Sequence, residues 1–184
     1  MKLLVTLLFS AVLFAVQPLA AQTDTITPEA QISERTGRLV PVVRDKSRRK
    51  AAPDFTLPDA SGKPLTLSAY KGKVVLLDFW ATWCHGCKTE IPWYVEFYKA
   101  YRSQGLAVIG VSMDDGGMKV VKPFLAEKGI EYPVVIGSEA LANRYGLTAM
   151  PLTLLIDREG RIAVSHAGVV DKQDFESHIR ELLK

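Results

Sequence analysis

Cysteine is scarce in this chain: its 184 residues contain two, Cys84 and Cys87. With no further cysteine, a separate structural disulfide elsewhere in the chain is excluded. The pair itself is therefore reactive, bound to a metal or incidental.

The sequence also lacks a strong excess of charge of one sign and any repeat period. Its 23 basic and 20 acidic residues leave a formal charge of +3, which is too small to predict a nucleic-acid partner. The 10 prolines and 13 glycines follow no repeat, which excludes collagen-like and solenoid folds. A hydrophobic content of 48% with 23% charged residues is typical of a globular protein, and the length fits one compact domain with extensions.

The N-terminal apolar stretch is short for a membrane-spanning helix. Residues 3–16 are apolar except for two polar positions, whereas about 20 residues are needed to cross a bilayer. Lys2 precedes this stretch, and Pro18 and small residues up to Ala21 follow it, which is the pattern of a secretory signal. We predict that residues 1–21 are a cleaved signal peptide and that the protein is exported to the periplasm. An uncleaved N-terminal anchor is the alternative.

Residues 22–50 are polar, show little apolar periodicity and end in a basic run from Arg44 to Lys50. We interpret them as a solvated linker or arm, and a tether to an anionic membrane is the alternative. The stretch 40–43 could add an edge strand. A folded domain is predicted over residues 51–184.

From residue 51 onward, apolar runs alternate with helical patterns. Strands are predicted at 55–57 and 65–67, which form a hairpin, and at 73–79, 106–112, 132–136, 152–157 and 161–165. Helices are predicted from 84 to about 103, through 121–125 to Gly129, over 138–145 and from Asp171 onward. The last two strands are antiparallel because the turn between them is too short for a crossover. This order predicts an α/β fold with a central mixed β-sheet, helices on both of its faces and an N-terminal β-hairpin extension.

The two cysteines stand where the buried strand 73–79 leads into the following helix. Cys84 would occupy the first turn, where free N–H groups and the helix dipole stabilise an anion and lower the pKa of a thiol. Cys87 lies one turn later on the same face, within reach of a mixed disulfide on Cys84. The spacing predicts Cys84 as the nucleophile and Cys87 as the resolving thiol.

Three other interpretations of the pair compete with this one. A zinc site needs two more ligands, but His85, His166 and His178 show no paired ligand spacing. Covalent haem attachment needs a histidine directly after the second cysteine, where the chain has Lys88. Two inert core cysteines are not expected at a helix N-terminus. We predict a redox-active disulfide, with no metal and no further cofactor.

Residues 79–88, with the sequence FWATWCHGCK, resemble the active-site segment of thioredoxin-fold proteins. The resemblance is strongest to the exported TlpA/ResA-like thiol:disulfide oxidoreductases of the AhpC/TSA–redoxin superfamily. It extends over residues 53–184 and includes the segments 52–57 and 146–151. It implies a thioredoxin-like fold and dithiol–disulfide exchange with protein substrates.

The resemblance also implies a substrate-binding surface beside the cysteines. Pro151 would be a cis-proline that faces the pair, and the backbone at Met150 would pair with the substrate chain by strand addition. Trp83 would belong to the same surface. Without the resemblance, Pro151 would be interpreted only as a proline at the start of a strand.

Acidic residues are expected near the pair on the same grounds. Asp78 and Glu90 fall where relatives keep a carboxyl group, and a desolvated carboxylate could relay the proton of Cys87. A solvent-exposed Glu90 is the alternative. His85, when protonated, would stabilise the neighbouring thiolate, and a solvent-facing His85 is the alternative.

In two places the chain departs from the family pattern. Gly86 stands where many relatives have proline, which predicts a looser helix start. Leu152 stands where the subgroup that matures cytochrome c often has glutamate, which argues against an apocytochrome substrate. The stretch 114–117 is interpreted as a loop with helix-capping residues rather than as a cation site.

The favoured hypothesis is a monomeric thiol:disulfide oxidoreductase, a reductant in the cell envelope that acts on protein disulfides or dithiols. It would exchange electrons with a membrane thiol donor or acceptor. A peroxiredoxin-like thiol peroxidase is the second hypothesis, but those enzymes carry Pro-x-x-x-Thr/Ser-x-x-Cys. Here Asp78 stands four residues before Thr82, and Thr82 only two before Cys84. A non-enzymatic metal-binding module is the third.

Overall fold

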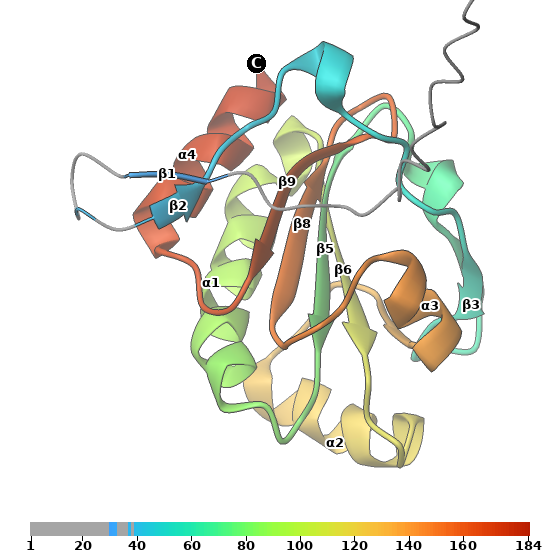
Figure 1. The fold of residues 1–184 in the computed structure, drawn as a ribbon. Helices are drawn as coiled ribbons and strands as arrows, with labels where there is room; N and C mark the ends of the chain where they lie inside the picture. Colours follow the sequence, from blue (N-terminus) through green and yellow to red (C-terminus); the bar gives the residue numbers. More distant parts are fainter. Residues whose placement is uncertain (1–29, 33–36, 38) are drawn as a thin grey trace, which may run out of the picture.

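The computed structural model describes residues 30–32, 37 and 39–184 (Figure 1). The predicted signal peptide, residues 1–21, lies outside the described residues. Within the described ranges, no helix is both long enough and apolar enough to cross a membrane.

The elements predicted from residue 55 onward are confirmed, with small differences at their ends. The strands are β1 Ala30–Ile32, β2 Leu39–Pro41, β3 Thr56–Pro58, β4 Pro64–Thr66, β5 Val74–Trp80, β6 Leu106–Ser112, β7 Val134–Ile136, β8 Leu152–Ile156 and β9 Ile162–Ala167. The α-helices are α1 His85–Tyr101, α2 Met118–Lys128, α3 Glu139–Arg144 and α4 Lys172–Leu183. Short 3-10 helices are η1 Lys46–Arg48, η2 Leu67–Tyr70 and η3 Arg102–Gln104.

A five-stranded mixed sheet with the order β7-β6-β5-β8-β9 forms the centre of the protein. β5 pairs in parallel with β6 and antiparallel with β8, and β8 pairs antiparallel with β9. All seven residues of β5 are buried, as expected for an apolar run that is covered on both faces. The predicted mixed sheet is confirmed.

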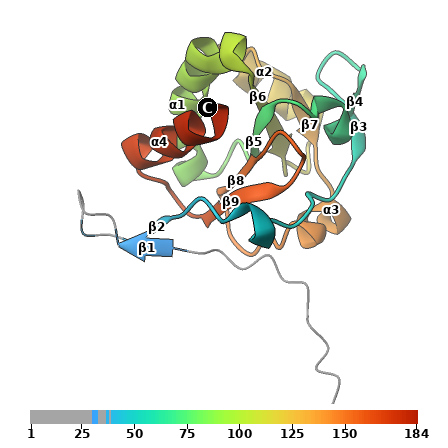
Figure 2. The same cartoon turned by 90° about the horizontal axis from the view of Figure 1, so that it is seen from above.

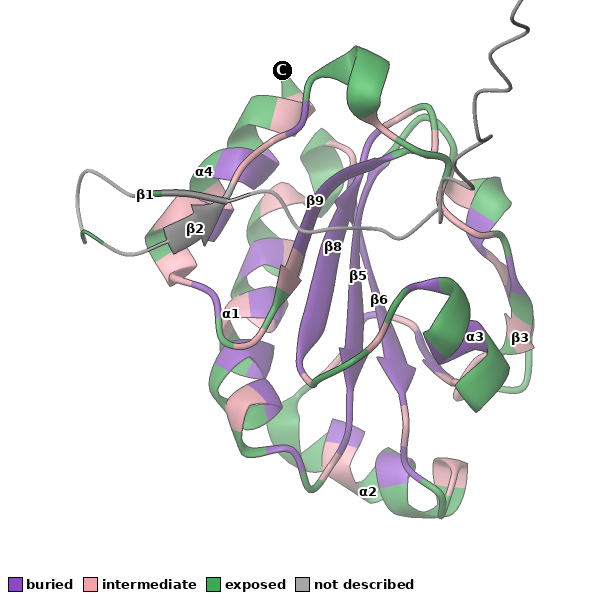
Figure 3. Ribbon diagram, in the orientation of Figure 1, coloured by how far each residue is buried: buried purple, intermediate pink, exposed green. Residues whose placement is uncertain are grey.

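Helices cover both faces of this sheet (Figure 2). On one face, α1, α2 and α4 pack against side chains such as Leu76 of β5. On the other face, α3 and the β3–β4 hairpin pack against side chains such as Leu77. Successive side chains of a strand point to opposite faces, so one continuous apolar strand contributes to both cores. The buried residues accordingly concentrate in the strands of the sheet (Figure 3).

Residues 44–50 lie along β9. The Arg44 N–H donates a hydrogen bond to the Ala163 carbonyl oxygen at 2.9 Å. Arg49 and Asp157 form a buried ion pair, with 3.0 Å between Nη1 and Oδ2. Part of the segment predicted as a linker therefore contacts the domain, and the boundary at residue 51 remains a prediction. β1 and β2 pair with each other as a separate two-stranded sheet.

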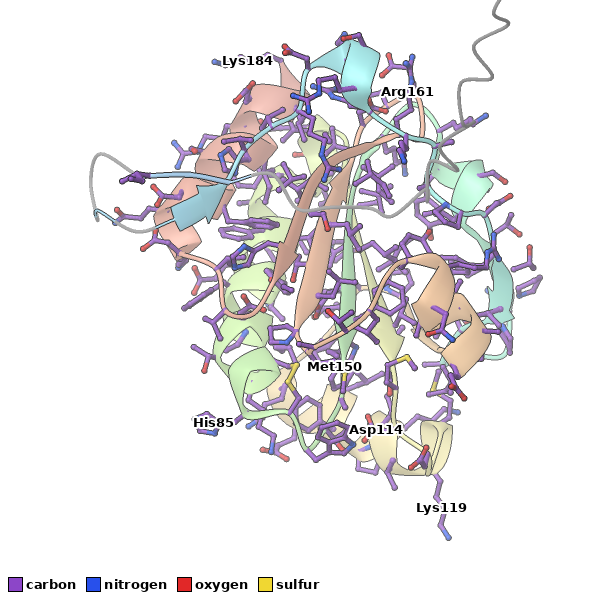
Figure 4. All side chains as sticks on the ribbon, viewed as in Figure 1. His85, Asp114, Lys119, Met150, Arg161 and Lys184 are labelled. Atoms are coloured by element: carbon purple, nitrogen blue, oxygen red, sulfur yellow. A yellow bond between two sulfur atoms is a disulfide. The ribbon has the colours of Figure 1, made fainter. Side chains whose placement is uncertain are left out.

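The two ends of the central sheet carry different parts of the chain. Figure 4 shows Lys184 and Arg161 at one end, beside the turn of η1. His85 and Met150 lie at the opposite end, where β5 leads into α1.

Candidate redox-active site

The cysteine pair lies at the junction between β5 and α1. β5 ends at Trp80, and α1 begins at His85 with Cys84 as its N-cap. Cys84 and Cys87 form a disulfide with an S–S distance of 2.02 Å. The Cys87 N–H donates a hydrogen bond to Cys84 Sγ at 3.2 Å. The sulfur therefore satisfies one of the free N–H groups in the first turn of the helix.

The two cysteines differ in exposure. Cys84 is 6% exposed, whereas Cys87 is fully buried. The preceding residue, Trp83, is 64% exposed, which is unusual for so large an apolar side chain. The site thus has one slightly exposed cysteine, one fully buried cysteine and an exposed apolar ring next to them in the chain.

Pro151 packs against the start of α1. The Met150–Pro151 peptide bond is cis, as the resemblance implied. Pro151 is buried and Met150 is half-buried, directly before β8. The Pro151 Cδ lies 3.2 Å from the position that a Cβ would take at Gly86, between the two cysteines. The cis-proline and the cysteine motif are therefore brought together.

Gly86 has a steric reason to be glycine. A Cβ at this position would lie 2.9 Å from Val169 Cγ2, in addition to its close approach to Pro151. Val169 belongs to the loop between β9 and α4 and is 49% exposed. The loop and the cis-proline together occupy the space that a side chain at residue 86 would need.

Asp78 and Glu90 are both buried in the layer between β5 and α1, with 1% and 0% exposed. The alternative of a solvent-exposed Glu90 is therefore wrong. Burial raises the pKa of Glu90 to about 7, although hydrogen bonds from the Val170 N–H and from Tyr94 lower it. Burial also raises the pKa of Asp78 well above its usual range, and the charge of Glu90 raises it further.

Two hydroxyl groups that the sequence analysis missed adjoin these carboxyl groups. Tyr94 Oη lies 2.9 Å from Thr153 Oγ1, which donates a long hydrogen bond of 3.4 Å to Asp78 Oδ1. The signal for Tyr94 is its place four residues after Glu90 on one helix face. The signal for Thr153 is its place opposite Asp78 in the register of β5 and β8.

The stretch 114–117 forms a loop that ends at the N-cap of α2, as predicted, but Asp114 does not cap the helix. The N-cap of α2 is Gly117, without a side-chain hydrogen bond. The buried Asp114 carboxylate instead accepts hydrogen bonds from the Thr82 N–H at 2.9 Å, the Thr82 hydroxyl at 2.5 Å and the Ser112 hydroxyl at 2.8 Å. A buried carboxylate needs such donors, and here they come from the loop that precedes Cys84. Asp114 therefore fixes that loop.

The three histidines lie on separate elements. His85 is exposed at the start of α1 and projects away from the fold (Figure 4). His166 is half-buried on β9 and His178 is buried on α4, and desolvation lowers the pKa of both. Among the described residues, no group of three or more His, Cys, Asp or Glu side chains could hold a metal ion.

A sequence profile of the AhpC/TSA family matches residues 49–165, more than half of the chain. The chain belongs to the AhpC/TSA family. Among its members, the chain is similar to the thiol-disulfide oxidoreductase ResA of Geobacillus thermodenitrificans (strain NG80-2). The two are 36% identical over 132 residues, which cover 71% of this chain and 75% of the relative. ResA of Bacillus subtilis (strain 168) is 38% identical over 129 residues, which cover 70% of this chain and 72% of the relative.

The solved structures agree with this family. The crystal structure of a thiol:disulfide interchange protein of the thioredoxin family from Chlorobium tepidum TLS matches with a TM-score of 0.69 and 29% identity. The match covers 76% of this chain and 100% of that chain. The predicted thioredoxin-like fold is confirmed, and this AhpC/TSA family member is a thiol-disulfide oxidoreductase with a CxxC pair at disulfide distance.

Proposed function

We propose that Cys84 attacks disulfides of protein substrates and that Cys87 resolves the mixed disulfide. The observation that supports these roles is the hydrogen bond from the Cys87 N–H to Cys84 Sγ at the helix N-terminus. In the reduced protein, the same N–H and the helix dipole would stabilise a thiolate on Cys84. Cys84 is also the more exposed of the two, so a substrate reaches it first.

The proposed cycle conserves electrons and protons. The Cys84 thiolate attacks one sulfur of a substrate disulfide, and the other substrate sulfur leaves as a thiolate that takes up a proton. The Cys87 thiol then loses its proton, attacks Cys84 Sγ and displaces the second substrate sulfur as a thiolate. Two electrons pass to the substrate, and the Cys84–Cys87 disulfide forms. We propose no cofactor besides this cysteine pair, because its reduced form carries the two electrons that pass to the substrate.

Asp78 and Glu90 are proposed to accept the proton that Cys87 releases. Both are buried beside α1, and a carboxyl group whose pKa is about 7, as for Glu90, exchanges protons readily at neutral pH. His85 is proposed to stabilise the Cys84 thiolate when it is protonated.

The substrate chain is proposed to bind across Trp83, Met150 and Pro151. The exposed ring of Trp83 offers apolar contact area next to Cys84. The chain at Met150 lies directly before β8, where an extended peptide could add to the backbone. Recognition through backbone groups would suit a range of unfolded or extended protein substrates.

We further propose that the protein is a monomeric reductant in the cell envelope, recharged by a membrane thiol protein. The predicted signal peptide supports export, and an exported reductant needs electrons from across the membrane. Equilibration with glutathione measures the reduction potential of the Cys84–Cys87 pair, which decides the direction of electron flow. A potential near about −270 mV is expected for a reductant, and one near about −120 mV would make the protein a disulfide donor.

Replacing Cys87 with serine tests the roles of the cysteines. Cys87→Ser is expected to trap substrate proteins as mixed disulfides on Cys84, visible as adducts that disappear on reduction. Cys84→Ser is the matched control and should trap none. Trapping by Cys84→Ser alone, or by neither variant, would refute the assignment. Rapid consumption of hydrogen peroxide by the wild type would favour the peroxidase alternative.

A further inference from the structure

A row of polar side chains crosses the apolar core next to the cysteine pair. Tyr94 Oη is 2.9 Å from Thr153 Oγ1, and Thr153 Oγ1 is 3.4 Å from Asp78 Oδ1. Glu90 lies one helical turn before Tyr94, and both of these side chains are fully buried. Two hydroxyl groups thus lie between two carboxyl groups, contributed by α1, β5 and β8.

The Glu90 end of the row has a spare acceptor. Oε1 accepts the Val170 N–H at 2.7 Å, whereas Oε2 is buried and receives no hydrogen bond of ordinary geometry from any described residue. Tyr94 is the side chain whose hydroxyl lowers the pKa of Glu90 as a hydrogen-bond donor. The Tyr94 hydroxyl is hydrogen-bonded to Thr153 and lies one helical turn from Glu90, whose Oε2 is the nearby acceptor without a partner.

Each hydroxyl has one proton to donate, so the row has two consistent arrangements. When Asp78 holds the carboxyl proton, Asp78 donates to Thr153, Thr153 to Tyr94, and Tyr94 to Glu90. When Glu90 holds it, every donor is reversed and the row ends at an ionised Asp78. The contact between Tyr94 and Thr153 allows either hydroxyl to be the donor.

We propose that Tyr94 and Thr153 form a reversible hydrogen-bond chain through which Asp78 and Glu90 share one proton. The inference rests on the proposed function, in which these carboxyl groups take the proton of Cys87. Tyr94 and Thr153 are then positioning residues. They hold the carboxyl groups as one unit that shares one proton before exchange, and the ionised member of the unit accepts the proton leaving Cys87 Sγ as the disulfide forms. This proton returns to Cys87 when a thiol donor reduces the disulfide.

No cation in the described part of the chain neutralises this row. Neither lysine nor arginine contributes to the pKa shift of Asp78 or of Glu90. The other titratable groups on elements packed around the row are Tyr132 before β7, His166 opposite Thr153 on β9, and His178 on α4. Burial raises the pKa of this tyrosine and lowers that of both histidines, so all three favour their uncharged forms. Two carboxylates would therefore repel each other uncompensated, which favours retention of one proton.

Removing either hydroxyl group tests the hydrogen-bond chain, because the two deletions should shift the carboxyl ionisation constants in opposite directions. In Tyr94→Phe, Glu90 loses its donor while Thr153 always donates to Asp78. The ionisation constant of Glu90 should then fall about tenfold and that of Asp78 should rise about tenfold. In Thr153→Val the two changes should be reversed, since Tyr94 then donates only to Glu90. The ¹³C shifts of both carboxyl carbons against pH, in the oxidised full-length protein, report these constants without interference from thiols.

Tyr145→Phe is the matched control. Its hydroxyl is also buried and donates to the Pro53 carbonyl oxygen at 2.6 Å, but on the other face of the sheet. Neither carboxyl titration should move in this variant, and Thr153→Ser should keep the wild-type titrations. Shifts of both carboxyl groups in one direction, or no shift, would overturn the inference. If one deletion variant does not fold, the two shifts of opposite sign in the other variant decide.

The outcomes separate this inference from the proposed function. If Cys87→Ser traps substrates and the carboxyl titrations do not move in opposite directions, the shared proton is refuted and the cysteine roles stand. If no variant traps substrates but the titrations do move in opposite directions, the cysteine roles are refuted and the hydrogen-bond chain stands.

Discussion

The Val170 N–H donates a 2.7 Å hydrogen bond to Glu90 Oε1, so a carboxyl group of α1 holds the loop between β9 and α4. The preceding loop residue, Val169, fills the space above Gly86 in the first turn of the same helix. The loop therefore contacts α1 at two places one turn apart, one of them inside the cysteine motif. A change at either contact should affect the other.

Glu90→Gln should make the unfolding free energy of the protein less dependent on pH. The folded pKa of Glu90, about 7, lies above its ordinary value of 4.5, so the folded state binds this proton more tightly than the unfolded chain does. Stability from this group is complete below pH 4.5, is lost as the pH rises to about 7, and stays lost above it. Relative to wild type, Glu90→Gln should gain about 3 kcal/mol of unfolding free energy over that interval.

Denaturant unfolding of the oxidised protein at acidic and alkaline pH measures this gain. Glu96→Gln, at an exposed position of the same helix, is the control and should show no comparable change. A difference between Glu90→Gln and wild type that stays constant with pH would contradict the raised pKa.

Gly86→Ala should destabilise the protein although alanine is the better helix former. The gain in helix propensity is at most about 1 kcal/mol, whereas forcing a methyl group against Val169 and Pro151 costs about 1–3 kcal/mol. In a Val169→Ala background the clash is relieved, so Gly86→Ala should become neutral or stabilising. Thermal unfolding of the four proteins in this double-mutant cycle measures the coupling, and additive effects would show that Val169 does not limit residue 86.

Asp114→Asn should loosen the loop that carries Trp83. The neutral amide weakens three hydrogen bonds that the carboxylate receives from Thr82 and Ser112, at an expected cost of about 2 kcal/mol. Asp115→Asn, at the exposed neighbouring position, should cost almost nothing. Urea unfolding midpoints compare the two variants, and equal midpoints would mean that Asp114 does not hold the loop.

Arg49→Ala should test whether the segment before residue 51 belongs to the folded domain. The substitution leaves the buried Asp157 carboxylate without its ion-pair partner, which costs about 3 kcal/mol. Lys46→Ala, at an exposed position of η1, is the control and should be within about 0.5 kcal/mol of wild type. Indistinguishable unfolding curves for the two variants would indicate that the segment before residue 51 is a linker and not part of the folded domain.

Much of the fold was predictable because local patterns carry it. The apolar run of β5 indicated a buried central strand, and the strand has all seven of its residues buried. The last helix was expected to start at Asp171, and Asp171 is its N-cap, with a side chain that accepts the N–H groups of Gln173 and Asp174. The position of Cys84 at the start of a helix followed from the strand–helix junction in the same way.

The supporting contacts of the site were not predictable from local patterns. Val170 lies 80 residues after Glu90 in the chain, and Thr153 lies 75 residues after Asp78. Such pairs meet only when the strands are assembled, so neither sequence spacing nor residue preference indicates them. At Asp114, local preference and tertiary contacts disagree. The residue type favours a helix cap, but the buried carboxylate requires hydrogen-bond donors from another loop.

The opposite placement of the chain end and the disulfide has a practical consequence. Lys184 lies at the far end of the central sheet from His85 and Met150 (Figure 4). A reporter, a surface linker or a second enzyme fused behind Lys184 therefore starts one sheet length away from the sulfur atoms. An incoming protein can approach Trp83 without meeting the fused part, so immobilised or labelled forms should exchange disulfides as fast as the untagged protein.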